Sequence, residues 1–305
     1  MKHIRIGTRG SKLALWQANF IASKLLAAGW NTQIVTIDTK GDKLLDVSIS
    51  KIGSKGVFTE EIEDQLRSGS IDIAVHSAKD LQSSLPDDLE LIACTERENP
   101  ADILASYKTL LIDQPLTIGT SSTRRVALLK KYYPHFNIVS VRGNLQTRFE
   151  KMKNGACDAL MLAYAGVYRM GFGENIVHQF PLDTFTPPTG QGIVAIEASV
   201  HLKPEIRTAV RAVINDENSE ITLNTERAFL KVLEGGCSIP AFCHAEIVVE
   251  KLQVLAGLST LDGSVIIRKS EITDIENGVE VGKSLALQIL NEGGREILNE
   301  IRKSI

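Results

Sequence analysis

The sequence predicts an α/β protein with two similar α/β domains and a small α+β domain at the C-terminal end. Short apolar runs alternate with helical patterns over the first two hundred residues, which is typical of α/β units. A strand, a small polar loop and a helix start occur twice, at residues 6–11 and 118–123. From about Asn215 the pattern changes to alternating strands followed by two helices, which indicates a separate α+β domain.

Length and composition are those of an ordinary globular protein. The 305 residues can form two or three domains, and 43% are hydrophobic while 23% are charged. A net charge of −3 argues against a nucleic-acid partner bound by bulk electrostatics. The N-terminus lacks the apolar core of a signal peptide, and no apolar run reaches the roughly 18 residues of a membrane span. We therefore expect a cytoplasmic protein with no membrane partner.

The cysteines indicate a reducing compartment and one exposed thiol. The sequence contains four of them: Cys94, Cys157, Cys237 and Cys243. They form no CxxC pair and no disulfide-like spacing, and Cys237, Cys243 and His244 fit no zinc pattern, so we predict no metal site. Gly235 and Gly236 precede Cys237 in a predicted turn, which makes its thiol a candidate nucleophile or attachment point. The alternative is a small apolar residue in a turn.

The first domain is expected to contain four strands and two helices in alternation. The strands are at 4–8, 33–37, 71–76 and 89–94, and helices start at Ser11 and Thr59, each a favoured N-cap. The Gly- and Lys-rich segment 39–56 has little apolar periodicity and predicts a long mobile loop. Residues 77–80 follow a buried strand, at the carboxyl end where open α/β sheets usually place ligands.

The strands and helices of the second and third domains are predicted from the same kind of pattern. Strands are expected at 118–119, 138–141 and 158–163 with a helix at 144–154, then strands at 245–250, 253–259, 265–269 and 270–273 with helices at 278–291 and 294–303. Crossovers near 95–101 and 187–192 between two similar domains are typical of the hinged, periplasmic-binding-protein-like architecture. We expect the last strands and helices to form the small α+β domain.

Eight cations lie in or beside these loops: Arg9, Lys51, Lys55, Arg124, Arg125, Arg142, Arg148 and Arg169. Any one of them alone is usually part of a solvated face. Arg124 and Arg125 differ because they follow a Gly-Thr-Ser-Ser loop at a helix start, which suits an anion. Guanidinium groups bind carboxylate or phosphate in a bidentate manner, so the pattern predicts a ligand with several anionic groups of either kind.

Seven loop motifs occur in a fixed order: Thr8-Arg9-Gly10-Ser11, Gly53-Ser54-Lys55-Gly56-Val57-Phe58, His76-Ser77-Ala78-Lys79-Asp80, Gly119-Thr120-Ser121-Ser122-Thr123-Arg124-Arg125, Val141-Arg142-Gly143-Asn144, Gly190-Gln191-Gly192 and Gly235-Gly236-Cys237. In order and spacing, from about residue 4 to 301, this set resembles the porphobilinogen deaminase family, also called hydroxymethylbilane synthases. The resemblance implies a transferase of haem and other tetrapyrrole biosynthesis. Such an enzyme joins four porphobilinogen molecules head to tail into hydroxymethylbilane and releases ammonia.

The resemblance also implies a covalent cofactor and the residues that hold it. A dipyrromethane primer would be attached to Cys237 through a thioether. Its carboxylates would be bound by Ser77, Lys79, Thr120, Ser121, Ser122, Arg124, Arg125, Arg142 and Gly143. Substrate would be bound by Arg9, Ser11, Phe58, Arg148, Arg169 and Gln191, with Lys51 and Lys55 on a lid. Porphobilinogen carries one acetate and one propionate, so the resemblance implies that the anionic groups of the ligand are carboxylates rather than phosphates.

Asp80 is the predicted catalytic carboxylate. It would stabilise the positive charge that develops on a pyrrole nitrogen when ammonia leaves, and we expect it to be buried and ionised. The alternative is a helix cap or an ion pair with Lys79. The family commonly continues with Val-Pro after this position, whereas this chain has Leu81-Gln82, which is expected to loosen the turn. His76, on a strand, is expected to be a buried histidine rather than a base.

The resemblance implies that the strand after Gly192 and the next helix return to domain 1. The boundaries then are 1–98 with 190–214 for domain 1, 99–189 for domain 2 and 215–305 for domain 3. We expect a monomer that acts on a small molecule. The alternative is a non-catalytic solute-binding or sensor module for a small polyanion, which would give Asp80 and the Gly-Gly-Cys loop no role.

Overall fold

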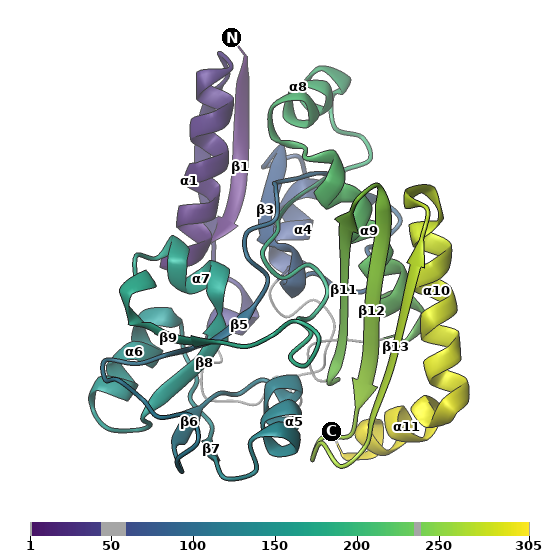
Figure 1. Cartoon of the computed structure of the whole chain (residues 1–305). Coiled ribbons are helices and arrows are strands. Elements are labelled where there is room, and N and C mark those ends of the chain that lie inside the picture. Colours follow the sequence, from purple (N-terminus) through teal and green to yellow (C-terminus); the bar gives the residue numbers. More distant parts are fainter. Residues whose placement is uncertain (1, 44–58, 235–238, 305) are drawn as a thin grey trace. The chain divides into compact units, whose positions relative to one another are not determined.

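The computed structural model describes residues 2–43, 59–234 and 239–304 and shows a mixed α/β fold (Figure 1). The chain forms two compact units. One comprises Met1–Glu98 and Gly192–Ile221, and the other comprises Asn99–Gln191 and Thr222–Ile305. In the described part of the chain, no helix combines the length and the apolar character that crossing a membrane requires.

The first unit contains a five-stranded sheet in the order β2-β1-β3-β10-β4. Its elements are β1 (His3–Arg9), α1 (Lys12–Ala27), β2 (Asn31–Ile37), α2 (Lys40–Lys43), α4 (Glu60–Arg67), β3 (Ile73–Ser77), the 3₁₀ turn η1 (Ala78–Asp80), β4 (Leu89–Cys94), β10 (Val194–Ser199) and α8 (Pro204–Ile214). β1 is parallel to β2 and β3, whereas β10 is antiparallel to β3 and β4. The expected strands and helices of this unit are present, and α2 begins inside the segment expected to be a loop.

Helices cover both faces of this sheet because successive strand residues point to opposite sides. On one face, Ile6 and Val75 pack with residues of α1 and α8. On the other face, Ala74 and Ile37 pack against Ile62 of α4. The carboxyl ends of the parallel strands β1 and β3 lie at the same edge, so the loops that follow them are brought together there.

The second unit contains a sheet of the same topology, in the order β7-β6-β8-β5-β9. Its elements are β5 (Asp102–Ala105), β6 (Thr117–Gly119), α5 (Thr123–Tyr132), β7 (Asn137–Val139), α6 (Leu145–Lys153), β8 (Ala159–Ala163), α7 (Tyr164–Arg169), η2 (Gly173–Asn175) and β9 (Ile176–Gln179). β6 is parallel to β7 and β8, and β5 is antiparallel to β8 and β9. The predicted internal repeat is therefore confirmed, although the short strands β5 and β9 were not expected.

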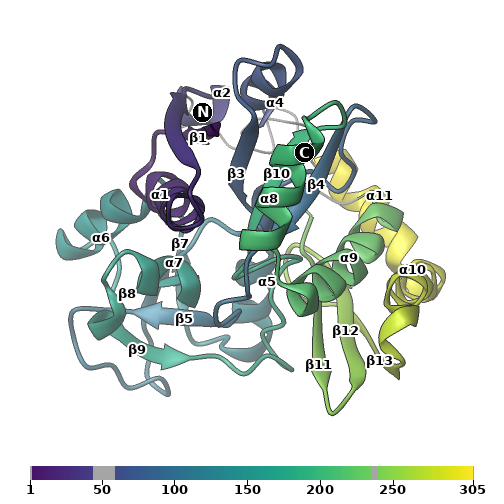
Figure 2. The same cartoon turned by 90° about the horizontal axis from the view of Figure 1, so that it is seen from above.

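The C-terminal part has a three-stranded antiparallel sheet flanked by helices, as expected for an α+β domain (Figure 2). Its elements are α9 (Glu217–Val232), β11 (Ala241–Val248), β12 (Lys251–Ser259), β13 (Ile266–Thr273), η3 (Ile275–Asn277), α10 (Gly278–Ile289), η4 (Leu290–Gly294) and α11 (Arg295–Ser304). The two strands expected at 265–273 are one strand, because β13 pairs without interruption along β12. Gly293, with φ of 105°, takes the left-handed conformation that separates α10 from α11.

Candidate active site

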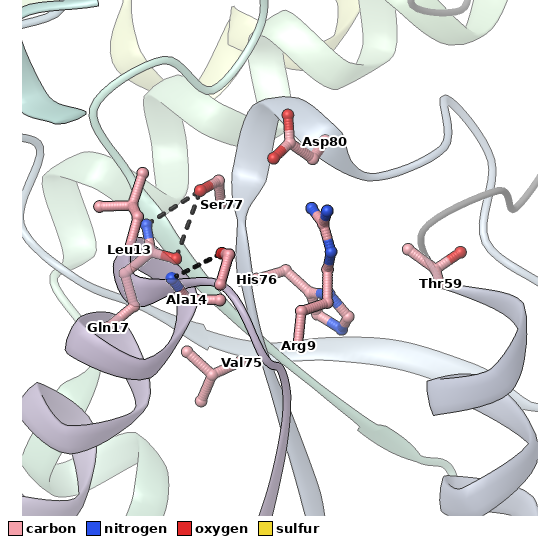
Figure 3. A pocket seen from close by; sticks show the side chains of 10 residues that line it. Arg9, Leu13, Ala14, Gln17, Thr59, Val75, His76, Ser77 and Asp80 are labelled. Atoms are coloured by element: carbon pink, nitrogen blue, oxygen red, sulfur yellow. Dashed lines mark hydrogen bonds between the residues drawn. The ribbon is translucent and has the colours of Figure 1, made fainter. Parts of the chain in front are cut away.

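A polar pocket lies in the first unit, where β1 and β3 end (Figure 3). Its lining residues are Arg9, Ser11, Leu13, Ala14, Gln17, Thr59, Val75, His76, Ser77 and Asp80. Arg9 ends β1, and Ser77 ends β3, so the sheet itself positions both side chains. Ser11 is the N-cap of α1 and accepts a hydrogen bond from the Ala14 amide at 3.3 Å. Four predicted site residues, Arg9, Ser11, Ser77 and Asp80, thus meet in one pocket.

Gln17 fixes the hydroxyl of Ser77. The Gln17 side chain is buried, and its Nε2 donates to Ser77 Oγ at 2.9 Å. The sequence analysis named neither Gln17 nor Thr59 as a pocket residue. The signal for Gln17 was present, because it is a polar residue on the buried face of an otherwise apolar stretch of helix. Buried polar side chains are usually hydrogen-bonded, and here the partner is a predicted ligand-binding serine.

Asp80 is exposed at the rim of this pocket, so the expectation that it is buried is wrong. It is the last residue of η1, whose N-cap is Ser77, and so it does not cap that turn. Figure 3 shows the guanidinium of Arg9 extending from β1 toward the Asp80 carboxylate. Lys79, the neighbouring predicted site residue, is half-buried on the same turn. The lining of the pocket therefore includes both a cation and a carboxylate.

The segment after Asp80 is held at two points, in contrast to the loosened turn that we expected. Leu81 is buried, and the side-chain amide of Gln82 donates to Thr59 Oγ1 at 3.3 Å and to Glu63 Oε1 at 3.2 Å. Both acceptors lie at the start of α4. The turn that carries Asp80 is thus connected to a neighbouring helix.

His76 is buried, as the sequence predicted, and it lies against a second buried ionisable group. Its Nε2 is 3.1 Å from Oε2 of Glu197, and the Glu197 side chain is fully buried. β10 runs antiparallel to β3, with Ala195 opposite His76, which brings Glu197 to the same face of the sheet. The sequence analysis missed Glu197, although a carboxylate within the apolar run 193–198 was a visible signal.

In the second unit, the hydroxyl-rich loop between β6 and α5 makes local hydrogen bonds. Ser121 Oγ lies 3.0 Å from Ser140 Oγ and donates to the Val141 carbonyl at 3.1 Å. Ser122 caps α5 by accepting from the Arg125 amide, and Thr120 is buried. These bonds fix the loop at a helix N-terminus, which is the arrangement that favours anions.

Arg124 and Arg125 form a buried network with Asp102, a residue that the sequence analysis did not name. Arg124 Nη2 donates to Asp102 Oδ2 at 2.6 Å, and Arg125 donates to Oδ1 through Nη2 at 2.8 Å and Nε at 3.0 Å. Gln191 completes the network by donating to Asp102 Oδ1 at 3.1 Å and to the Pro100 carbonyl at 2.6 Å.

The network sets the charge of Asp102. Burial alone would raise the pKa of this carboxyl group, but the charges of Arg124 and Arg125 and the bonds from Arg125 and Gln191 outweigh it and lower the pKa to about 2. Asp102 therefore stays ionised inside the protein. The role of these arginines in binding the cofactor remains a prediction.

The loop before α6 is built around Gly143. This glycine has φ of 114°, and a Cβ there would lie 2.8 Å from Thr147 Cγ2, so no larger residue fits. Its carbonyl accepts from Arg148 Nε at 2.8 Å, and Asn144 caps the helix through the Thr147 amide at 2.9 Å. The predicted arginines of this region are half-buried: Arg142, Arg148 and Arg169.

Cys237, Phe58, Lys51 and Lys55 lie outside the described residues. The other cysteines, however, are described, and all three are buried: Cys94, Cys157 and Cys243. Burial raises the pKa of the Cys94 thiol to about 12 and that of the Cys157 thiol to about 11. A thiolate is the reactive form of cysteine, so Cys94 and Cys157 are poorly suited to covalent attachment of a ligand.

The chain is thus a mixed α/β protein with a polar pocket at the carboxyl ends of two parallel strands. Comparison with known proteins is more specific. A family model described as "Porphobilinogen deaminase, dipyromethane cofactor binding domain" matches residues 4–204, and one described as "Porphobilinogen deaminase, C-terminal domain" matches residues 220–291. The chain belongs to the porphobilinogen deaminase family.

Individual relatives agree with the family models. A protein from Desulfosudis oleivorans named porphobilinogen deaminase is 53% identical over 304 residues, which cover 98% of each chain. One of the same name from Cytophaga hutchinsonii is 52% identical over 307 residues, covering 100% of this chain and 98% of that protein. Among solved structures, the BvgS periplasmic VFT2 domain of Bordetella pertussis is 15% identical with a TM-score of 0.41 and covers 70% of this chain and 86% of that one.

Proposed function

We propose that this protein is a porphobilinogen deaminase, a transferase that joins four porphobilinogen molecules head to tail into hydroxymethylbilane and releases ammonia. Family membership over both matched regions is the observation that carries this conclusion. The enzyme belongs to haem and other tetrapyrrole biosynthesis. The pocket supports the assignment, since it combines a cation and hydroxyl groups for carboxylates with a separate carboxylate at the rim.

The residues present fit a dipyrromethane cofactor. Its acetate and propionate groups require cations and hydrogen-bond donors, and Arg9, Ser11 and Ser77 offer these in the first unit. In the second unit, the loop before α5 offers hydroxyl groups at a helix N-terminus. Cys237 is proposed as the attachment residue because its Gly-Gly-Cys loop resembles the attachment loop of the family, and the burial of the other three thiols supports this: Cys94, Cys157 and Cys243. When bound, the cofactor supplies the pyrrole carbon to which the first substrate is joined.

Asp80 is proposed to act on the substrate. Porphobilinogen loses ammonia to give an electron-poor azafulvene, and positive charge develops on its pyrrole nitrogen. A fixed carboxylate stabilises that charge and accepts a hydrogen bond from the pyrrole N–H group. Asp80 can also hold a proton on its way to the leaving amine or from the newly substituted carbon. Its exposed position at the pocket rim gives a substrate direct access to it.

Arg9 is proposed to bind substrate carboxylates, because its guanidinium lines the pocket and can bind a carboxylate in a bidentate manner. The bond from Gln17 on α1 holds the hydroxyl of Ser77 in the pocket, where it can donate to a second carboxylate. In this proposal, Arg9 and Ser77 bind the carboxylates of the ligand, whereas Asp80 stabilises the positive charge on the pyrrole.

The remaining proposals concern organisation. We propose a cytoplasmic monomer without a nucleic-acid partner, with domain 1 formed by residues 1–98 and 190–214, domain 2 by 99–189 and domain 3 by 215–305. The strand order shared by the two large sheets supports the division between the first two domains. The separate antiparallel sheet of β11, β12 and β13 supports the third.

Two measurements on the purified protein test the proposed function. Intact-mass spectrometry is expected to show an adduct of two pyrrole units on the parent chain and on a Cys157→Ser control, but none on Cys237→Ser. Incubation with porphobilinogen is expected to release ammonia and hydroxymethylbilane. A protein that binds porphobilinogen without an adduct and without turnover would instead be a non-catalytic solute-binding or sensor module.

A further inference from the structure

Gln82 connects the turn that carries Asp80 to the first turn of α4. Its Nε2 donates both of its hydrogens, to Thr59 Oγ1 at 3.3 Å and to Glu63 Oε1 at 3.2 Å. Thr59 precedes α4, and Glu63 lies within its first turn. The connection therefore runs from a loop at the end of β3 to a helix that packs on the same sheet.

Glu63 is a well-anchored acceptor for this amide. The residue is only 3% exposed, and its other oxygen accepts from Arg67 Nη2 at 3.4 Å. Arg67 is itself held by Asp64 at 2.9 Å and by Asp88 at 2.7 Å. A buried carboxylate that loses a hydrogen-bond donor is costly, which favours retention of the bond to Gln82. The position of Gln82 is thus fixed by α4.

The position of Asp80 is set by contacts of the residues on either side of it in the chain. The Ser77 hydroxyl, before the turn, is bound by Gln17, and Leu81 is buried directly after it. The Leu81 amide closes the turn by donating to the Ala78 carbonyl at 3.3 Å. The Asp80 side chain is exposed between these fixed points. An exposed carboxylate on a short turn keeps its orientation only as long as both ends of that turn are held.

We propose that Gln82 is a positioning residue: it holds the carboxylate of Asp80 in the orientation that the reaction requires. The inference rests on the proposed function of Asp80. A displacement of about 1 Å of a catalytic group can lower a rate by about 10²-fold, so loss of one anchor has a measurable effect on turnover. Substrate binding rests on Arg9 and the hydroxyl groups and is not expected to depend on Gln82.

The first test compares Gln82→Ala with Gln288→Ala. Gln288 on α10 is also a glutamine whose amide donates to a hydroxyl, Ser284 Oγ at 3.2 Å, but it lies in the C-terminal part of the chain. We expect Gln82→Ala to lower kcat about 10-fold with KM and cofactor loading unchanged. Gln288→Ala is expected to retain parental kcat. An unchanged kcat in Gln82→Ala, or a rise in KM alone, would overturn the proposal.

A charge exchange tests the bond itself. Gln82→Glu places a carboxylate beside buried Glu63, so its kcat is expected to fall further than that of Gln82→Ala. The double variant Glu63→Gln/Gln82→Glu exchanges the amide and the carboxylate and lets the bond form in the opposite direction. We expect it to recover most of the kcat lost in Gln82→Glu. A double variant no faster than Gln82→Glu would show that the bond is not what matters.

A double-mutant cycle with Asp80→Asn separates this inference from the proposed function. If Gln82 acts through Asp80, Gln82→Ala lowers kcat in the parent but has little further effect in the Asp80→Asn background. An equal loss in both backgrounds would assign Gln82 a purely structural role and leave the function of Asp80 intact. Parental turnover in Asp80→Asn would overturn the proposed role of Asp80, and the inference with it.

Discussion

The carboxylate of Asp102 on β5 lies 2.8 Å from Nη2 of Arg125 on α5, and both side chains are at most 8% exposed. Arg124 reaches the second oxygen of the same carboxylate. Two arginines that the sequence marked as ligand-binding therefore share one buried counter-ion within their own unit. Removal of one member of this network leaves a buried charge without its partner, which is costly, so variants of these residues have to be tested for stability as well as for ligand binding.

Asp102→Asn is expected to lower the free energy of unfolding by about 3 kcal/mol at neutral pH, because it removes the charge that two buried arginines share. The native pKa of Asp102, about 2, lies below its ordinary value of 3.8, so its stabilisation is complete above pH 4 and is lost as the pH falls through about 2. Urea unfolding of parent and variant is thus expected to converge at acid pH. An exposed control is Asp113→Asn. A difference that does not change with pH would contradict this account.

We expect Arg142→Leu to impair cofactor binding alone, and Arg124→Leu to impair both cofactor binding and stability. Arg142 is half-buried, and its substitution is expected to remove the proposed bidentate contact to a ligand carboxylate, worth roughly 1.5–3 kcal/mol of binding. Arg124 is buried against Asp102, so its substitution lowers the melting temperature as well. Cofactor loading by mass spectrometry, together with calorimetry, separates the two effects. A normally active Arg142→Leu enzyme with a lowered melting temperature would place Arg142 in a structural ion pair.

Asp80 variants are expected to rank in the order Asp, Glu, Asn. Asp80→Asn keeps the shape but removes the charge, so kcat falls by about 10² or more. Asp80→Glu keeps the charge one methylene away and retains more activity. Because Asp80 is exposed, neither variant is expected to change the melting temperature. Equal turnover of the Asn variant and the parent would remove Asp80 from the chemistry.

Thiol labelling of cofactor-free protein is expected to modify Cys237 alone. Cys94 and Cys157 are buried with raised pKa values of about 12 and about 11, and Cys243 is fully buried. Iodoacetamide under native conditions therefore adds one label to the parent and none to Cys237→Ser, as peptide mapping checks. Labelling of Cys243 in the folded protein would contradict its burial and would reopen the question of the attachment residue.

Glu197→Gln is expected to lower the free energy of unfolding, because the Glu197 side chain is fully buried with its Oε2 3.1 Å from His76 Nε2, and the substitution changes this polar contact inside the core. The matched control is Glu205→Gln on α8, an exposed glutamate in the same unit. Urea unfolding measures both. Equal stability of the two variants would show that the contact between Glu197 and His76 does not contribute to stability.

The sequence alone predicted those features that are local. The helix start at Ser11 follows from the preference of serine for the N-cap, and Ser11 accepts the expected backbone bond, whereas Thr59 precedes α4 without a side-chain cap bond. The repeated strand-loop-helix pattern predicted two similar α/β domains, and the ordered motifs predicted the family. Each of these signals is contained in a short stretch of the chain, so it can be recognised without knowing the fold.

Only the tertiary structure decided which polar groups are paired. Asp102 and Arg124 are 22 positions apart in the sequence, and Gln82 and Glu63 are 19 positions apart. Glu197 lies beside His76 because its strand joins the sheet much later in the chain. The exposure of Asp80 was likewise misjudged. Local periodicity reports which face of an element is apolar, but burial and charge pairing depend on which elements become neighbours, and that is set by the packing of strands far apart in sequence.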